Sequence, residues 1–169
     1  SSWTRFSVPV SYLVKSCDSV TVAAASGNAL GNFMVNGSWL MVDNLQLKSG
    51  GTACPIPGFS FENWTALTYE DPDNWGSLNN AFAKIGIGGD TIVAKTSDAN
   101  SGSYAVKLTT SVYGPDTAYA LVSLGGWDVN NNVPIGIPFT LQYAYLNGYY
   151  KSAPASAGDS AALQFEAFN

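Results

Sequence analysis

Apolar and polar residues alternate along most of this chain, which is the pattern of half-buried β-strands. Residues 1–48 hold three such segments, at 3–13, 20–25 and 38–47. Shorter segments follow at 58–61, 91–95, 103–110, 120–124, 138–145, 148–151 and 159–168. Runs of Gly, Pro, Asn and Asp separate them and predict turns. Helical periodicity is confined to 78–85, where we expect only a short turn of helix.

Many short strands separated by turns predict an all-β fold, and their spacing favours a two-sheet antiparallel jelly-roll sandwich. A chain of 169 residues is long enough for one such domain with a sizeable core. Apolar residues make up 46% of the chain and charged residues 11%, which is typical of a packed domain and not of a disordered one.

The chain has two cysteines, Cys17 and Cys54. If the first three strands are consecutive and antiparallel, the first and third run parallel, and both cysteines lie at one pole of the sheet. A disulfide is then within reach and would contribute about 3–4 kcal/mol. The alternative is two unpaired thiols in a reducing compartment. We favour the bridge because the rest of the composition is typical of an extracellular protein.

Charge and composition exclude several classes of function. The net charge is −5 and the seven Lys and Arg residues are scattered, so no basic patch for nucleic acid can be drawn. No apolar run approaches the roughly 20 residues that span a bilayer. The chain has no histidine, which removes the commonest general base and the commonest metal ligand. We therefore expect a protein without catalytic activity and without a cofactor.

The densest group of acidic residues is Glu62, Glu70, Asp71 and Asp73. A glycosidase needs two carboxylates about 5–10 Å apart across a cleft. We interpret the group instead as a solvated acidic turn. A weaker interpretation is a calcium site that uses Asp71 and Asp73, because carboxylate oxygens are hard ligands.

Several blocks of sequence resemble a carbohydrate-metabolism domain of Bacteroidota secreted proteins. Its opening strands are similar to Phe61-Glu62-Asn63-Trp64, to Pro72-Asp73-Asn74-Trp75 and to residues 102–108. Its later strands are similar to residues 136–139, 146–151 and 158–161, and its closing strands to residues 3–12, 17–20 and 37–45. The closing strands therefore stand at the front of this chain.

The resemblance implies a jelly roll, export to the cell surface and no established enzymatic activity. We divide the chain into closing strands at 1–48, a linker at 49–57 and the main part of the jelly roll at 58–169. The displaced order has three explanations: a window cut from a tandem array, donation of the front strands to a neighbouring copy, or permutation within one unit. Because the strand pattern starts at once, we expect a processed or excised piece of a longer product.

Sugar binding would use exposed aromatic side chains as flat platforms. The candidates in or beside loops are Trp75, Trp127, Tyr113, Tyr149 and Tyr150, whereas Trp39 and Trp64 are expected in the core. Four short Asp-Ser or Asp-Thr motifs are similar to O-glycan acceptors of Bacteroidota, at Ser19, Thr91, Thr117 and Ser160. The favoured function is a non-catalytic structural module, a repeat or subunit of a surface array or filament that binds copies of itself. The alternative is a carbohydrate-binding module.

Overall fold

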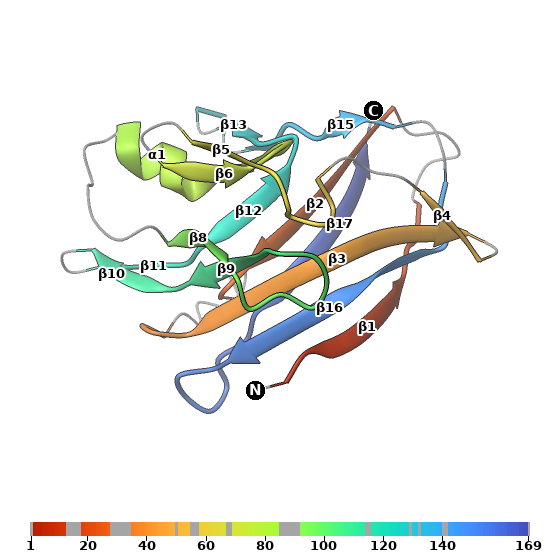
Figure 1. Cartoon of the computed structure of the whole chain (residues 1–169). Coiled ribbons are helices and arrows are strands. Elements are labelled where there is room, and N and C mark those ends of the chain that lie inside the picture. The colour runs from red at the N-terminus through yellow and green to blue at the C-terminus, as the bar shows by residue number, and fades with distance from the viewer. Residues whose placement is uncertain are drawn as a thin grey trace.

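The fold was analysed in a computed structural model, which describes residues 2–12, 18–27, 35–49, 51–54, 58–66, 69–84, 92–113, 116–128, 130–131, 133–139 and 142–168. Within that part of the chain two antiparallel sheets pack against each other as a β-sandwich (Figure 1). The all-β prediction is confirmed.

The larger sheet has the strand order β1-β16-β3-β9-β8, and β4 pairs with the end of β3. Its strands are β1 (Thr4–Pro9), β3 (Trp39–Ser49), β4 (Thr52–Cys54), β8 (Val93–Thr96), β9 (Ala105–Thr109) and β16 (Tyr145–Ala153). The strand β3 is buried on both faces, because the second sheet covers one face and the loop between β8 and β9 crosses the other (Figure 1).

In the smaller sheet β2 is central. The strand β17 pairs with one side of β2, and both β12 and β15 pair with its other side, at opposite ends of the strand. Its strands are β2 (Ser19–Ala25), β7 (Trp75–Ser77), β12 (Leu121–Leu124), β15 (Ile137–Pro138) and β17 (Ala162–Phe168). The main core lies between the two sheets, where Val22 and Val122 meet Val42, Leu45 and Val106.

Three two-stranded hairpins and one helix complete the described structure. The hairpins are β5 (Trp64–Ala66) with β6 (Glu70–Pro72), β10 (Ser111–Tyr113) with β11 (Asp116–Ala118), and β13 (Trp127–Asp128) with β14 (Val133–Pro134). The helix α1 (Leu78–Lys84) confirms the short helical turn expected there. Asn79 ties α1 to β8, because its amide donates to the Val93 carbonyl at 2.7 Å and accepts from the Val93 N–H at 3.2 Å.

The first three strands are not consecutive neighbours, which corrects the expected order. The strand β2 lies in the other sheet, and β16 pairs with both β1 and β3. The strands β1 and β3 still run parallel, since each is antiparallel to β16. All three strands of residues 1–48 form ladders with later segments of the same chain, and the expected linker at 49–57 contains β4.

Two expected strands are absent from the described residues. Residues 58–61 form a turn, closed by the Phe61 N–H donating to the Gly58 carbonyl at 3.2 Å. Gly58 and Phe61 have φ values of 79° and 53°, which a strand does not allow. Between β15 and β16, residues 139 and 142–144 are not strand, so the segment expected at 138–145 is also wrong. Nowhere in the described chain is a helix long and apolar enough to cross a membrane.

Candidate functional site

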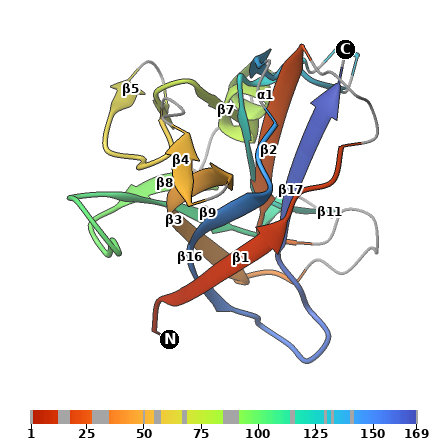
Figure 2. The same ribbon diagram turned by 90° about the vertical axis from the view of Figure 1, so that its right-hand side faces the viewer.

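On one side of the sandwich the edge strand β1 of the larger sheet and the edge strand β17 of the smaller sheet lie beside each other (Figure 2). An apolar groove lies between them. In the described part of the chain β1 pairs with β16 alone and β17 with β2 alone. Two adjoining hollows, each of about 290 Å³, form this groove, and Val8 and Leu163 line both. The groove therefore follows strand edges whose outer N–H and C=O groups lack a ladder partner.

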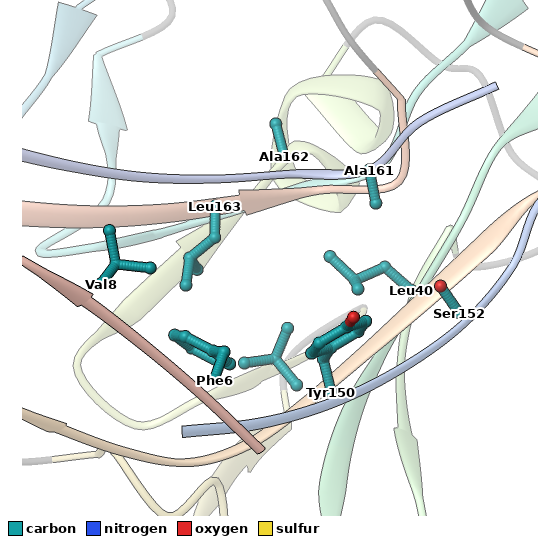
Figure 3. Close-up of a pocket in the computed structure, with 9 residues that line it drawn as sticks. Phe6, Val8, Leu40, Tyr150, Ser152, Ala161, Ala162 and Leu163 are labelled. Atoms are coloured by element: carbon teal, nitrogen blue, oxygen red, sulfur yellow. The ribbon is translucent and has the colours of Figure 1, made fainter. Parts of the chain in front are cut away.

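Strand alternation places the apolar side chains in this groove. Phe6 and Val8 of β1 point toward the hollow from one side and Leu163 of β17 from the other, and Tyr150 and Leu40 lie beside Phe6 (Figure 3). The ring of Phe6 packs against Tyr150 with the ring centroids 6.2 Å apart. Val8 remains 50% exposed, a large fraction for a valine beside a core. The groove thus presents an accessible apolar surface.

Tyr12 stands at the far end of the groove. Its ring meets Phe165 of β17 edge to face, with the centroids 5.9 Å apart. Its hydroxyl accepts the N–H of Tyr143 at 2.9 Å. Because Tyr12 contacts β17 and the segment before β16, it joins the two sheets where β1 ends. The Tyr12 ring therefore packs against Phe165, which lines the second hollow of the groove.

The structure corrects the prediction that Trp75 is an exposed platform. Trp75 is 5% exposed and packs between Phe59 and Phe61, and its Nε1 donates to the Gly58 carbonyl at 3.1 Å. Tyr150 faces the groove and not a sugar-binding surface outside it. Because the Trp75 ring is buried, it presents no flat face to which a sugar could bind.

The other aromatic candidates are scattered. Tyr149 neighbours Tyr150 in β16, so its side chain points to the opposite face. Trp127 lies in β13, and both it and Tyr149 are half-buried. The side chain of Tyr113 lies outside the described residues. Trp39 and Trp64 are half-buried as well, and Trp64 packs against the core. The structure does not bring the candidates together.

The acidic group is dispersed. Glu70 forms an ion pair with Lys95 at 3.2 Å, whereas Glu62 accepts N–H groups from the loop before β9. Asp71 lies in β6 with one carboxylate oxygen buried and unpartnered, and Asp73 is half-buried in the following turn. No group of three or more His, Cys, Asp or Glu residues is placed to hold a metal within the described ranges. The calcium interpretation of Asp71 and Asp73 stays a prediction.

Burial raises the pKa of Asp71, although the hydroxyl and the N–H of Ser77 act in the opposite direction. A pKa above the usual value means that the folded state holds the proton more tightly than the unfolded state. The stability contributed by the protonated carboxyl is therefore lost as the pH rises through the raised pKa. At neutral pH the ionised group lowers the free energy of unfolding.

We therefore expect Asp71→Asn to raise the free energy of unfolding at pH 7, by on the order of 1 kcal/mol. Below the usual pKa of 3.8 the difference from the wild type should vanish. Urea unfolding between pH 3 and pH 7 measures both values. Asp73→Asn removes a charge from the same turn and controls for net charge. A gain that is equal at all pH values would contradict the assignment to Asp71.

Cys54 is a half-buried free thiol in this structure. Its hydrogen bond with the phenol of Tyr143 is the main cause that raises the pKa of Tyr143. Cys17 lies outside the described residues, so the Cys17–Cys54 bridge stays a prediction. Tyr12 and Cys54 both contact Tyr143, so the chain that leaves β1 does approach Cys54.

The four expected O-glycan acceptors differ in accessibility. Ser160 is exposed, whereas Ser19 in β2 and Thr117 in β11 are half-buried. Thr91 lies outside the described residues. Modification of all four stays a prediction, and among the described positions Ser160 is the most accessible.

Tyr150 was named as a candidate from the sequence, but the other residues of the groove were not. The signal that could have found them is the alternation of Phe6, Val8 and Val10 in one strand and of Leu163, Phe165 and Ala167 in another. That signal shows that each strand has one apolar face, but it does not show that both strands are sheet edges.

No family of known proteins, no curated protein and no solved structure matches this chain.

Proposed function

We propose that the chain is a non-catalytic structural module of jelly-roll type in an extracellular array or filament of a bacterial surface. Neighbouring copies join head to tail by strand addition at the groove between β1 and β17. The observation that carries this proposal is an accessible apolar groove bounded by two edge strands. Strand addition gains backbone hydrogen bonds from such an edge and specificity from pockets that take alternate side chains.

The pattern of the two edges supports a second copy as the occupant. In β1 the groove-facing residues are apolar, and β17 has the same alternation of apolar inner and polar outer residues. A β1 strand laid beside β17 of another copy would continue that apolar face. The exposed Arg5 of β1 and the exposed Glu166 of β17 carry opposite charges, which favours this pairing.

The two edges are different surfaces, and this determines the form of the assembly. A contact between the β1 edge of one copy and the β17 edge of the next is heterologous. Heterologous contacts repeat into open filaments unless the rotation between copies closes a ring. One end of the filament then has a free β1 edge and the other end a free β17 edge, so copies can add at both ends.

Val8→Lys tests the proposal, because Val8 lines both hollows and is 50% exposed, so that the fold tolerates the change. Burial of the added charge should weaken association at least about tenfold, which corresponds to about 1.4 kcal/mol. Ser7→Lys is the matched control, since Ser7 is exposed on the other face of the same strand. Analytical ultracentrifugation over a wide concentration range measures association, and circular dichroism checks the fold.

Three outcomes would contradict the proposal. They are a wild-type chain that stays monomeric at every concentration, a Val8→Lys variant that associates like the wild type, and equal weakening by both variants.

The partial exposure of Trp127 and Tyr149 supports the alternative of a carbohydrate-binding module. Glycan-array binding by a monomeric chain, lost on Trp127→Ala, would favour that alternative.

A further inference from the structure

Two carboxylates from separate parts of the chain hold the loop at residues 97–104, which crosses the outer face of β3 (Figure 1). The Oδ2 atom of Asp43 accepts the N–H groups of Asn100 at 2.7 Å and of Ser101 at 2.9 Å. The Glu62 carboxylate accepts the N–H of Ser103 at 2.7 Å and that of Tyr104 at 3.3 Å. Both acids are therefore bound within five consecutive residues of one loop.

Gly102 lies between the two anchored parts of the loop and packs directly on Glu62. A Cβ atom built on Gly102 would lie 2.1 Å from Oε1 of Glu62, and its φ of +69° also favours glycine. The loop backbone therefore approaches this carboxylate more closely than any side chain would allow.

Hydrogen bonds within the chain leave one of the two carboxylate oxygens of Asp43 without a partner. Its side chain lies in β3 with an exposed fraction of 0%, and its Oδ1 atom has no hydrogen-bond partner. Since Oδ2 bonds to the loop, the second oxygen of the same carboxylate also lies beside the loop. A buried acceptor without a partner is costly, and more so when it is charged. Such an oxygen is able to bind a cation.

The electrostatics at this site favour a positive charge. The negative charge of Glu62 acts on the buried carboxylate of Asp43. In the described part of the chain the two ion pairs are Lys95 with Glu70 and Lys151 with Asp98. Neither ion pair includes Asp43 or Glu62, so the described residues place no basic side chain in an ion pair with either acid.

We propose that Asp43, Glu62 and the loop at residues 97–104 form a binding site for a calcium ion. Carboxylate oxygens are hard ligands, and two of these groups balance the charge of Ca²⁺. Calcium accepts about 6–8 oxygen ligands in flexible geometry, so backbone carbonyl oxygens of the loop and water can supply the rest. Magnesium prefers a stricter octahedron and keeps its waters, and zinc prefers nitrogen and sulfur.

The ion would join three segments that are far apart in the sequence. It would link β3, the segment between Phe61 and β5, and the loop before β9, and so hold this loop on the outer face of the larger sheet. An ion that binds only the folded state stabilises it by mass action. The expected consequence is a chain whose melting temperature depends on the calcium concentration.

The first test uses the full chain after removal of metal with EDTA. Isothermal titration with CaCl₂ should show one site, and a hundredfold excess over Kd should raise Tm by about 5–10 °C. Mg²⁺ at the same concentration should give a much smaller shift. Tb³⁺ is an independent probe, because Tyr104, whose N–H bonds to Glu62, is placed to sensitise its luminescence. A lack of both heat and Tm shift at millimolar Ca²⁺ would overturn the proposal.

The second test uses isosteric variants. Glu62→Gln should weaken Ca²⁺ binding at least about tenfold, as expected for the loss of about 1.4 kcal/mol from one charged ligand, and Asp43→Asn should do the same if it folds. Asp98→Asn is the control within the same loop, because Asp98 bonds to Lys151 and Trp3 instead. Asp71→Asn is a control for one of the two other buried, unpartnered carboxylate oxygens, which belong to Asp71 and Asp159. Unchanged affinity in Glu62→Gln, or lost affinity in Asp71→Asn, would show that the ion binds elsewhere.

Discussion

Replacing Trp75 with alanine is expected to lower the free energy of unfolding by about 3–5 kcal/mol. The Trp75 ring is 5% exposed, and its centroid lies 6.0 Å from that of Phe59 and 5.1 Å from that of Phe61. Its Nε1 also closes a hydrogen bond to the Gly58 carbonyl. Alanine would leave a large cavity at the point where the turn at residues 58–61 meets the smaller sheet.

Two variants separate the contributions of the Trp75 side chain. Trp75→Phe keeps an aromatic ring but removes the donor to Gly58, so it should cost less than alanine. Trp127→Ala removes a half-buried tryptophan of β13 and should cost less still. Urea unfolding followed by far-ultraviolet circular dichroism measures all three. Equal costs for Trp75→Ala and Trp127→Ala would show that Trp75 is not a core residue.

Gly125→Ala is expected to destabilise the chain by about 2–5 kcal/mol, the sum of a left-handed backbone at about 1–2 kcal/mol and a steric clash at about 1–3 kcal/mol. Gly125 has a φ of +79°, and a Cβ atom there would lie 1.9 Å from the Gly136 carbonyl oxygen. That neighbour is backbone and cannot rotate away. The turn after β12 would have to separate from the segment before β15.

Gly37→Ala is the matched control for Gly125→Ala. Gly37 has a φ of +86°, but a Cβ atom there would meet nothing within 4 Å. This variant should therefore show only the conformational cost, about 1–2 kcal/mol. The difference between the two melting temperatures isolates the clash. Equal shifts would mean that the backbone at Gly125 relaxes freely.

The sequence predicted the positions of the strands better than it predicted which strands pair with each other. Alternation located β2, β3, β9 and β12 to within about two residues, because these strands have a strong apolar face. It could not predict that β2 lies in the other sheet from β1 and β3. Alternation describes the face of a strand and carries no information on its partner, and this sandwich pairs residues far apart in the chain.

The candidate sites show a similar limit. The composition identified Glu62 as part of an acidic group with Glu70 and Asp71, since these residues are near in sequence. The structure joins Glu62 to the loop that Asp43 also holds, through hydrogen bonds to backbone N–H groups. The residue types in a sequence do not show which backbone N–H groups donate hydrogen bonds to a side chain. Trp75 was expected in or beside a loop as an exposed platform, but its ring packs against Phe61.

The pairing of β1 with β16 determines when this domain can finish folding during synthesis. Thr4 pairs with Tyr150, so β1 has no ladder until β16 has been synthesised, and β2 lacks its ladder with β17 until residues 162–168 have been made. Contacts this distant in sequence make folding slow. A nascent chain of this kind would expose β1 until β16 emerges, and it would need protection from aggregation during that time.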